Sequence, residues 1–201
     1  MSAPVSLAGR QLWAAVRAML VATAALGLLY PLLITGIAQV IAPGRANGSV
    51  VHEGGTVVGS TLMGQRFVDG AGNPLPQYFQ SRPSASDYVG TASGGSNLGP
   101  DSPELAGLIA QRRAAVAAFD GVPPADVPPD AVTASGSGLD PGISPAYAAI
   151  QIERVAAARH VPAADVSRLV AAATVRRDLG FIGAPYVNVL KLNIALDRNL
   201  P

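Results

Sequence analysis

The chain has 201 residues, a formal net charge of +1 and no cysteine. A charge this close to zero gives no electrostatic reason to expect a nucleic acid or an acidic macromolecule as partner. The absence of cysteine excludes disulfides, thiolate catalysis and cysteine-based metal sites, whatever compartment the chain occupies.

The most hydrophobic part of the chain is an uncharged segment over residues 18–44. A helix of this length, at about 1.5 Å per residue, spans ~40 Å, which exceeds the ~30 Å hydrocarbon core of a bilayer. We therefore predict a transmembrane helix over residues 18–44 that is kinked at Pro31. The alternative is a signal peptide cleaved after Ala42, but the apolar run is much longer than the ~7–15 residues of a signal peptide's apolar region.

Arginines flank this segment unequally, with Arg10 and Arg17 before it and only Arg45 close after it. The cytoplasmic flanks of membrane helices carry the excess of basic residues. The pattern therefore predicts a cytoplasmic N-terminus over residues 1–17 and an extracytoplasmic domain over residues 45–201, held by a single membrane-spanning anchor.

The domain of ~155 residues is long enough for a core of its own, and its pattern predicts an α+β fold with about three to four helices and a few short strands. Short strands are expected at residues 56–58 and 66–68, which are separated by glycines. Residues 70–100 are so rich in Gly, Pro, Ser and Asn that we expect a long loop without regular structure.

Capping residues mark the predicted helices. Ser102 and the proline after it begin a helix that ends before Gly121, and a second Ser-Pro pair predicts a helix from residue 144 to about 159. A third helix is predicted to open at Pro162. The apolar positions of residues 189–197 fit a strand and a helix equally well, and their length favours the helix.

Two catalytic routes can be tested against sequence motifs. Lys191 is the only lysine and follows a leucine, so the chain has neither the phosphate-binding loop of ATPases nor the Asp-Lys-Thr-Gly phosphorylation motif of P-type pumps. Ser96 and Ser137 lack the Gly-x-Ser-x-Gly frame of serine hydrolases. His52 and His160, the only histidines, are interpreted as surface residues, and their spacing does not match a metal-binding motif.

Three polar segments stand out, at residues 78–85, 93–100 and 133–141. Their glycines let backbone N–H groups converge on an acceptor, and their Ser, Thr and Asn side chains are short hydrogen-bonding groups. Tight turns with local side-chain caps would use the same residues, so a structural role stays open beside a binding role.

Arg82 is the one charged residue of the first segment, and Asp140 lies between Gly138 and Pro141. An arginine in a proline-stiffened loop suits bidentate contact with a carboxylate or with backbone carbonyls. The two residues would pair within the domain or make contacts across an interface, and we favour the interface. The residues expected at a partner interface are Tyr78, Phe79, Arg82, Ser135, Ser137 and Asp140.

In this order, the polar segments resemble the C subunit of the bacterial Kdp potassium-transporting ATPase. The resemblance extends from the anchor to the C-terminus and rests on five ordered blocks. They are GSTLMGQRF at residues 59–67, YFQSRPSA at 78–85, SGGSNLG at 93–99, TASGSGLDP at 133–141 continued by ISP at 143–145, and VNVLKLNIALD at 187–197. Gly142 departs from the pattern, because many members of the family are expected to carry a histidine there.

The resemblance implies a non-catalytic accessory subunit in the cell inner membrane, needed for the assembly and activity of a complex. In that complex a channel-like subunit carries potassium and a P-type subunit hydrolyses ATP. The family is described as a catalytic chaperone that raises the ATP affinity of the P-type subunit through a transient ternary complex, so no cofactor is expected to bind tightly. The implied nucleotide contacts lie in a segment that resembles the Ser-Gly-Gly of ABC-transporter signatures, namely Ser93, Gly94, Gly95, Ser96 and Asn97.

The predicted topology conflicts with direct nucleotide contact, because an extracytoplasmic domain meets no ATP. Any effect on ATP affinity would then pass through the membrane partners as a coupling free energy. Two other functions stay open from the residues. One is an anchored extracytoplasmic serine hydrolase using Ser96 or Ser137, and the other is an anchored binding module unrelated to transport.

Overall fold

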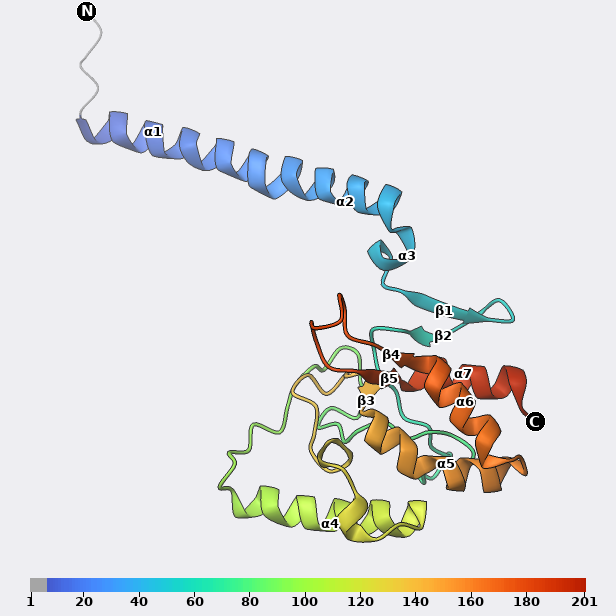
Figure 1. Ribbon diagram of the computed structural model, residues 1–201. Coiled ribbons are helices and arrows are strands. Elements are labelled where there is room, and N and C mark those ends of the chain that lie inside the picture. Colours follow the sequence, from blue (N-terminus) through green and yellow to red (C-terminus); the bar gives the residue numbers. More distant parts are fainter. Residues whose placement is uncertain (1–6) are drawn as a thin grey trace, which may run out of the picture. The chain divides into compact units, whose positions relative to one another are not determined.

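The computed structural model describes residues 7–201, which form two units, an N-terminal anchor up to Ser49 and a domain from Val50 to Pro201 (Figure 1). The anchor consists of consecutive helical segments, with the stretch Ala8–Ile41 long and apolar enough to cross a membrane. Its segments are α1 (Leu7–Ala22), a π-helical segment (Thr23–Leu29), α2 (Tyr30–Ile41) and the one-turn helix α3 (Pro43–Ala46).

The anchor helix differs from the predicted span of residues 18–44 at both ends. It begins at Leu7, because the boundary between charged and apolar residues marks the membrane core and not the end of a helix. It ends at Ile41, since Ala42, the residue before a proline, leaves helical conformation with φ −146° and ψ 61°. A kink was predicted at Pro31, and the structure has a π-helical segment over Thr23–Leu29 just before this residue. A proline supplies no N–H and crowds the carbonyl four residues earlier, which disturbs the regular helical hydrogen bonds.

The domain combines a hairpin, a small sheet and four helices, which confirms the α+β prediction. The hairpin pairs β1 (Val50–Glu53) with β2 (Thr56–Ser60), and the sheet is antiparallel with the order β3 (Gly142–Ile143), β5 (Tyr186–Asn188) and β4 (Thr174–Val175). The helices are α4 (Pro103–Asp120), α5 (Pro145–Arg159), α6 (Ala163–Ala173) and α7 (Val189–Asn199), with single 3₁₀ turns at Pro124–Asp126 and Pro129–Ala131.

The core lies between the sheet and the helices. Helix α5 packs against α6 and α6 against α7, all three contact the central strand β5, and α4 packs on α5 (Figure 1). Apolar side chains from every one of these layers are buried together. Among the most completely buried are Phe79, Ile143, Val155, Val166, Leu192 and Leu196.

The predicted helix starts are confirmed, because helix capping is decided within a few residues. Ser102, Ser144 and Asn188 each cap a helix by accepting a backbone N–H three residues on, at 3.4, 3.0 and 3.0 Å. The segment 189–197 is helical, as its length favoured. Helix α4 stops where Gly121 adopts a left-handed conformation with φ 68°.

The strand predicted at residues 66–68 is wrong. Val68 makes only an isolated bridge with Pro74. The Phe67 carbonyl accepts the Leu75 N–H at 2.9 Å and the Gln80 side-chain amide at 3.0 Å. A turn and a side chain therefore satisfy this backbone in place of a neighbouring strand. The long loop predicted over residues 70–100 does contain no helix or named strand.

Candidate functional site

The three polar segments of the sequence lie against one another in the structure. The Ser135 N–H donates to the Pro83 carbonyl at 3.0 Å, and the Gly94 N–H donates to the Ser137 carbonyl at 2.8 Å. The Ser93 hydroxyl donates to the same Ser137 carbonyl at 3.0 Å. We call residues 78–86, 93–97 and 133–140 the polar loop cluster, because these contacts join them into one structural element.

Glycines allow the chains of this cluster to approach closely. Gly138 has φ +69°, and a Cβ there would lie 2.7 Å from the Gly94 carbonyl oxygen and still closer to the Ser86 hydroxyl. A Cβ at Gly95 would lie 3.0 Å from the Gly136 carbonyl oxygen. The glycines are thus required by packing within the domain, which is the structural role that the sequence left open.

Most residues of the segment with an implied nucleotide contact, 93–97, already contact other parts of the domain. Ser93 and Gly94 direct their hydroxyl and N–H at Ser137, so these two donors do not point at a free acceptor. Ser96 and Asn97 are exposed at the surface. The segment 93–97 contains no basic residue to meet a phosphate. Its chemistry therefore offers little to a nucleotide.

Arg82 links two parts of the cluster. One guanidinium nitrogen lies 3.0 Å from a carboxylate oxygen of Asp140, and the other donates to the carbonyls of Thr133 and Ala134 at 3.2 and 3.4 Å. The backbone carbonyl of Arg82 accepts the Tyr88 hydroxyl at 2.6 Å, and burial raises the pKa of that hydroxyl to about 12. Of the two alternatives for Arg82, the structure shows pairing with Asp140 inside the domain.

Two buried amides hold the segment that precedes Arg82. Asn193 of α7 accepts the Phe79 N–H at 2.9 Å and donates to the Phe79 carbonyl at 3.0 Å. Gln151 of α5 does the same for Gln80, at 2.7 and 3.2 Å. The amides thus replace the neighbouring strands that an extended segment normally pairs with.

This arrangement corrects the expected interface role of two residues. The Phe79 ring is 0% exposed and belongs to the core, and Ser135 is 2% exposed. The backbone pairing with α5 and α7 draws Phe79 inward. Ser135 is buried against the first segment, because its N–H donates to the Pro83 carbonyl and its hydroxyl lies 3.1 Å from that of Ser137. Tyr78 stays half-buried, with its hydroxyl donating to Asp197 at 3.1 Å, and burial followed by the Asp197 charge raises its pKa.

A buried ion pair also contacts the backbone of the segment that precedes Arg82. Arg154 lies 2.7 Å from a carboxylate oxygen of Asp120 and also donates to the Tyr78 carbonyl at 3.0 Å. Burial raises the pKa of the Asp120 carboxyl, and the Arg154 charge opposes that rise. Sequence reasoning missed Gln151, Arg154 and Asn193. The helical spacing of the sequence could have indicated them, because Gln151 and Arg154 lie one turn apart on the same face of α5 as Ala148, which is buried.

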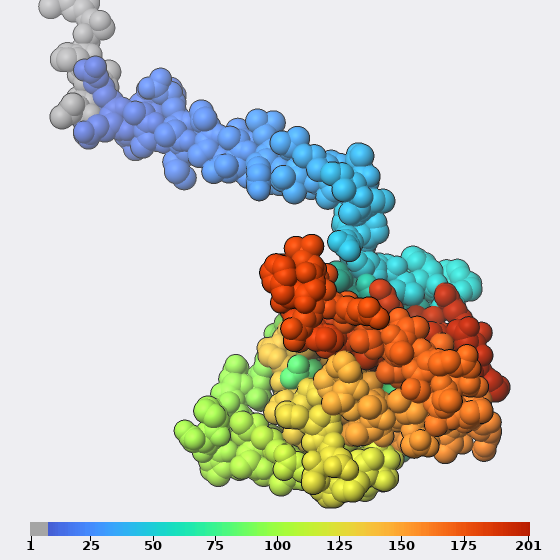
Figure 2. Space-filling view, in the orientation of Figure 1, coloured from blue at the N-terminus to red at the C-terminus, as the bar shows by residue number. Residues whose placement is uncertain are grey.

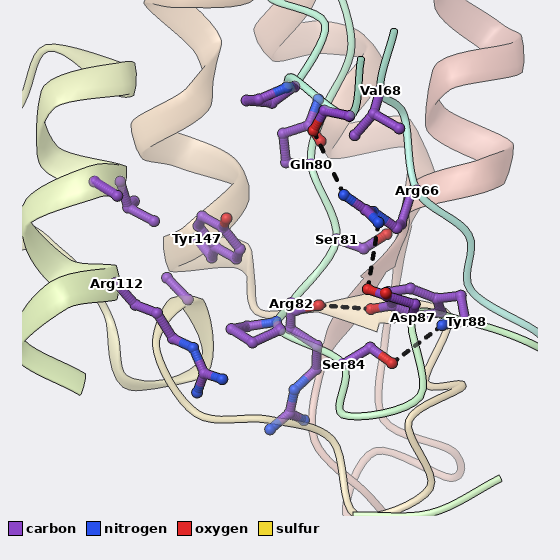
Figure 3. Close-up of a pocket in the computed structure, with 16 residues that line it drawn as sticks. Arg66, Val68, Gln80, Ser81, Arg82, Ser84, Asp87, Tyr88, Arg112 and Tyr147 are labelled. Carbon is purple, nitrogen blue, oxygen red and sulfur yellow. Dashed lines mark hydrogen bonds and ion pairs between the residues drawn. The ribbon is translucent and has the colours of Figure 1, made fainter. Parts of the chain in front are cut away.

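A cavity of about 440 Å³ opens between the cluster and α4 (Figure 3). On one side Arg66 pairs with Asp87 at 3.3 Å, and on the other Arg112 comes from α4 and donates to the Val132 carbonyl at 3.1 Å (Figure 3). Tyr147 and Arg82 complete its wall. The lining is rich in arginine, but each guanidinium is hydrogen-bonded to the protein itself.

In the part of the chain that the structure describes, the candidate nucleophiles Ser96 and Ser137 are not hydrogen-bonded to a histidine. His52 lies in β1 and His160 follows α5, whereas the Ser137 hydroxyl lies 3.1 Å from that of Ser135. Within residues 7–201, no group of three or more His, Cys, Asp or Glu side chains is placed to hold a metal ion. The contacts that the structure does show in this region are hydrogen bonds and close packing among the three segments.

Comparison with known proteins assigns similarity over almost the whole chain. A family model described as KdpC, K⁺-transporting ATPase, c chain, matches residues 12–198. A protein named potassium-transporting ATPase KdpC subunit from Kineococcus radiotolerans is 54% identical over 185 residues, covering 91% of both chains. Proteins of the same name from Gemmatimonas aurantiaca and Streptomyces coelicolor are 54% and 46% identical, over 90% and 98% of this chain and 91% and 96% of theirs.

Proposed function

This chain belongs to the KdpC family of K⁺-transporting ATPase subunits, and we propose that it is a non-catalytic accessory subunit required for assembly and activity of such a pump. The observation that carries the proposal is the family match over residues 12–198, which includes both the anchor and the domain. The proposed partners are the potassium-carrying channel-like subunit and the ATP-hydrolysing P-type subunit of the same complex.

The interior of the polar loop cluster supports the non-catalytic role. Its arginine, its buried serine and its glycines are engaged in contacts within the domain. Catalysis needs groups that are directed at a substrate, and the cluster directs its groups at its own backbone. The cluster is better suited to giving the domain a defined surface for a partner.

The pump itself provides the test of this proposal. Co-expression of the full chain with the potassium-carrying and ATP-hydrolysing subunits is expected to yield one co-purifying complex with potassium-stimulated ATPase activity. Omitting the chain, or replacing it by residues 50–201 without the anchor, should abolish that activity. A pump that keeps full activity without the chain, or a chain that never co-purifies, would overturn the proposal.

The domain is proposed to lie outside the cytoplasm. The unequal arginines, with Arg10 and Arg17 before the span and Arg45 after it, support this orientation. Because the chain has no cysteine, single-cysteine variants report position cleanly. A membrane-impermeant maleimide should label Ala114→Cys in intact spheroplasts and leave Ala8→Cys unlabelled until the membrane is opened. The reverse pattern would place the domain in the cytoplasm.

An effect on ATP use is proposed to be indirect, transmitted through the membrane partners. The donors of Ser93 and Gly94 are committed to Ser137, which supports an absence of tight nucleotide binding by this chain. Calorimetric titration of the full chain with ATP should give no submicromolar binding. Submicromolar affinity that is lost in Gly95→Ala would instead favour a transient ternary complex with nucleotide in this segment.

Contact with a partner helix is proposed along the anchor. Gly27 and Gly36 leave room for close approach, because a Cβ at Gly36 would meet no atom of this chain within 4 Å and one at Gly27 would meet only Thr23 at 3.7 Å. Replacing both with leucine should reduce co-purification of the complex without unfolding the domain. Unchanged yield would argue against assembly through this face.

A further inference from the structure

The loop between β4 and β5 carries three large apolar side chains in solvent. Leu179 is 82% exposed, Phe181 73% and Ile182 50%. None of the three belongs to the hydrophobic core. In Figure 2 the loop is the orange-red projection that stands clear of the rest of the domain. The domain therefore leaves a cluster of large apolar side chains unburied at this loop, and exposed apolar clusters mark contact sites.

The projecting tip is nevertheless an ordered turn. Asp178 and Ile182 exchange two backbone hydrogen bonds of 3.0 and 2.9 Å, and the Phe181 N–H donates to the Asp178 carbonyl at 3.2 Å. Leu179 has φ +52°, in the left-handed region that favours glycine. A strained position thus carries a large apolar residue that the fold does not bury. This favours a role for the side chain outside the domain.

Two arginines stand at the base of the tip. Arg176 and Arg177 are exposed, and among residues 7–201 their side chains have no carboxylate or carbonyl partner. With Asp178 counted, the loop keeps a positive charge. Apolar side chains ahead of arginines form the pattern that enters a bilayer interface, with the apolar groups at the acyl boundary and the guanidinium groups at the phosphates.

Only a short linker joins the domain to the spanning stretch. The spanning stretch ends at Ile41 and the domain starts at Val50, so residues 42–49 reach at most ~30 Å. Within the domain, strand β1 and the loop between β4 and β5 lie at the same end (Figure 1). The Asn188 amide donates to the Thr61 carbonyl at 2.8 Å, which joins the end of β5 to the end of β2 and fixes hairpin and sheet together.

We propose that residues 176–182 are a membrane-contact loop, which inserts Leu179, Phe181 and Ile182 at the boundary between headgroups and acyl chains of an anionic bilayer. A lipid surface fits better than a protein partner, because three side chains on a narrow tip cover far less than the ~800 Å² per partner of a stable protein interface. The loop then acts as a second attachment beside the anchor and restricts the orientation of the domain to the bilayer. This inference does not depend on which side of the membrane the domain occupies.

Tryptophan fluorescence tests the proposal on the full chain. Trp13 is the single tryptophan, so Trp13→Phe provides a dark background for Phe181→Trp, with Ala114→Trp on α4 as the matched control at an exposed site. Each variant is placed alone in nanodiscs of phosphatidylglycerol and phosphatidylcholine brominated on the acyl chains. We expect strong quenching and a blue shift for the indole at position 181, and neither for the one at position 114.

The charge of the loop gives the second readout. Arg176→Gln and Arg177→Gln, in the Phe181→Trp background, should each lower the ratio of inserted to withdrawn loop about fivefold in anionic nanodiscs, and less in purely zwitterionic ones. Equal quenching at positions 181 and 114 in lipid would overturn the proposal. So would an indole at position 181 that stays solvated in lipid and becomes protected only when the other pump subunits are added, because the loop would then dock on protein.

Discussion

Replacing Asn193 with alanine removes both hydrogen bonds that pair the Phe79 backbone. The Phe79 N–H lies 2.9 Å from the Asn193 amide oxygen, and the Phe79 carbonyl lies 3.0 Å from the amide nitrogen. Asn193 is 1% exposed and Phe79 is 0% exposed, so water does not replace the lost partners. Two buried polar groups are left unsatisfied in Asn193→Ala.

The expected loss follows from those two groups. An unsatisfied buried donor or acceptor costs ~1–3 kcal/mol, so the free energy of unfolding should fall by about 2–5 kcal/mol in Asn193→Ala. Urea titration of the full chain in detergent micelles, followed by circular dichroism, measures this loss. The anchor helix stays folded in the micelle, so the transition reports the domain.

A control on the same helix separates the buried pairing from a general effect of the substitution. Asn199 also lies in α7, and its amide donates to the Ala195 carbonyl at 2.7 Å, but this bond is exposed. Asn199→Ala should therefore change the unfolding free energy by less than ~0.5 kcal/mol. If both variants lose the same unfolding free energy, or if Asn193→Ala loses less than ~1 kcal/mol, the buried Asn193 amide does not hold the Phe79 backbone in place.

Three further outcomes are expected in the same unfolding assay. The free energy of unfolding should fall by at least ~2 kcal/mol more in Gly138→Ala than in Gly121→Ala. Both positions have φ near +68°, but only a Cβ at Gly138 meets a backbone oxygen, at 2.7 Å. Equal losses in the two variants would show that close packing does not require the glycine at position 138. The double-mutant cycle of Arg82→Ala and Asp140→Ala should give a coupling of ~1 kcal/mol, reduced by the partial exposure of the pair, and additive losses would mean that the ion pair adds nothing. Burial raises the pKa of Asp120 above its unfolded value of 3.8, so its stabilising contribution is full below that pH and is lost as the pH rises through the folded pKa. Wild type should therefore gain stability relative to Asp120→Asn between pH 7 and pH 4, and a difference independent of pH would contradict the raised pKa.

Much of the architecture follows from short-range features of the chain. An uncharged run as long as residues 18–44 has few outcomes other than a spanning helix, and the structure contains a helix of that kind. Ser102 and Ser144 cap helices through bonds to the third residue along the chain, so neighbours decide where those helices start. The five ordered blocks identified the family, and the match over residues 12–198 confirms it.

The site depended on contacts that no local pattern contains. The sequence marked Arg82 and Asp140 as candidates, but 58 residues separate them, and only the folded domain decides that they pair with each other. Phe79 was expected at an interface and is in the core, because its backbone is satisfied by Asn193, which lies 114 residues further along. Strands of two or three residues, such as β3 and β5, are too short to show the alternation of apolar and polar residues that marks a strand. Their pairing could therefore not be predicted from the sequence either. Caps and apolar runs stabilise structure within a few residues, whereas an extended segment gains stability only from the partner that the rest of the fold brings to it.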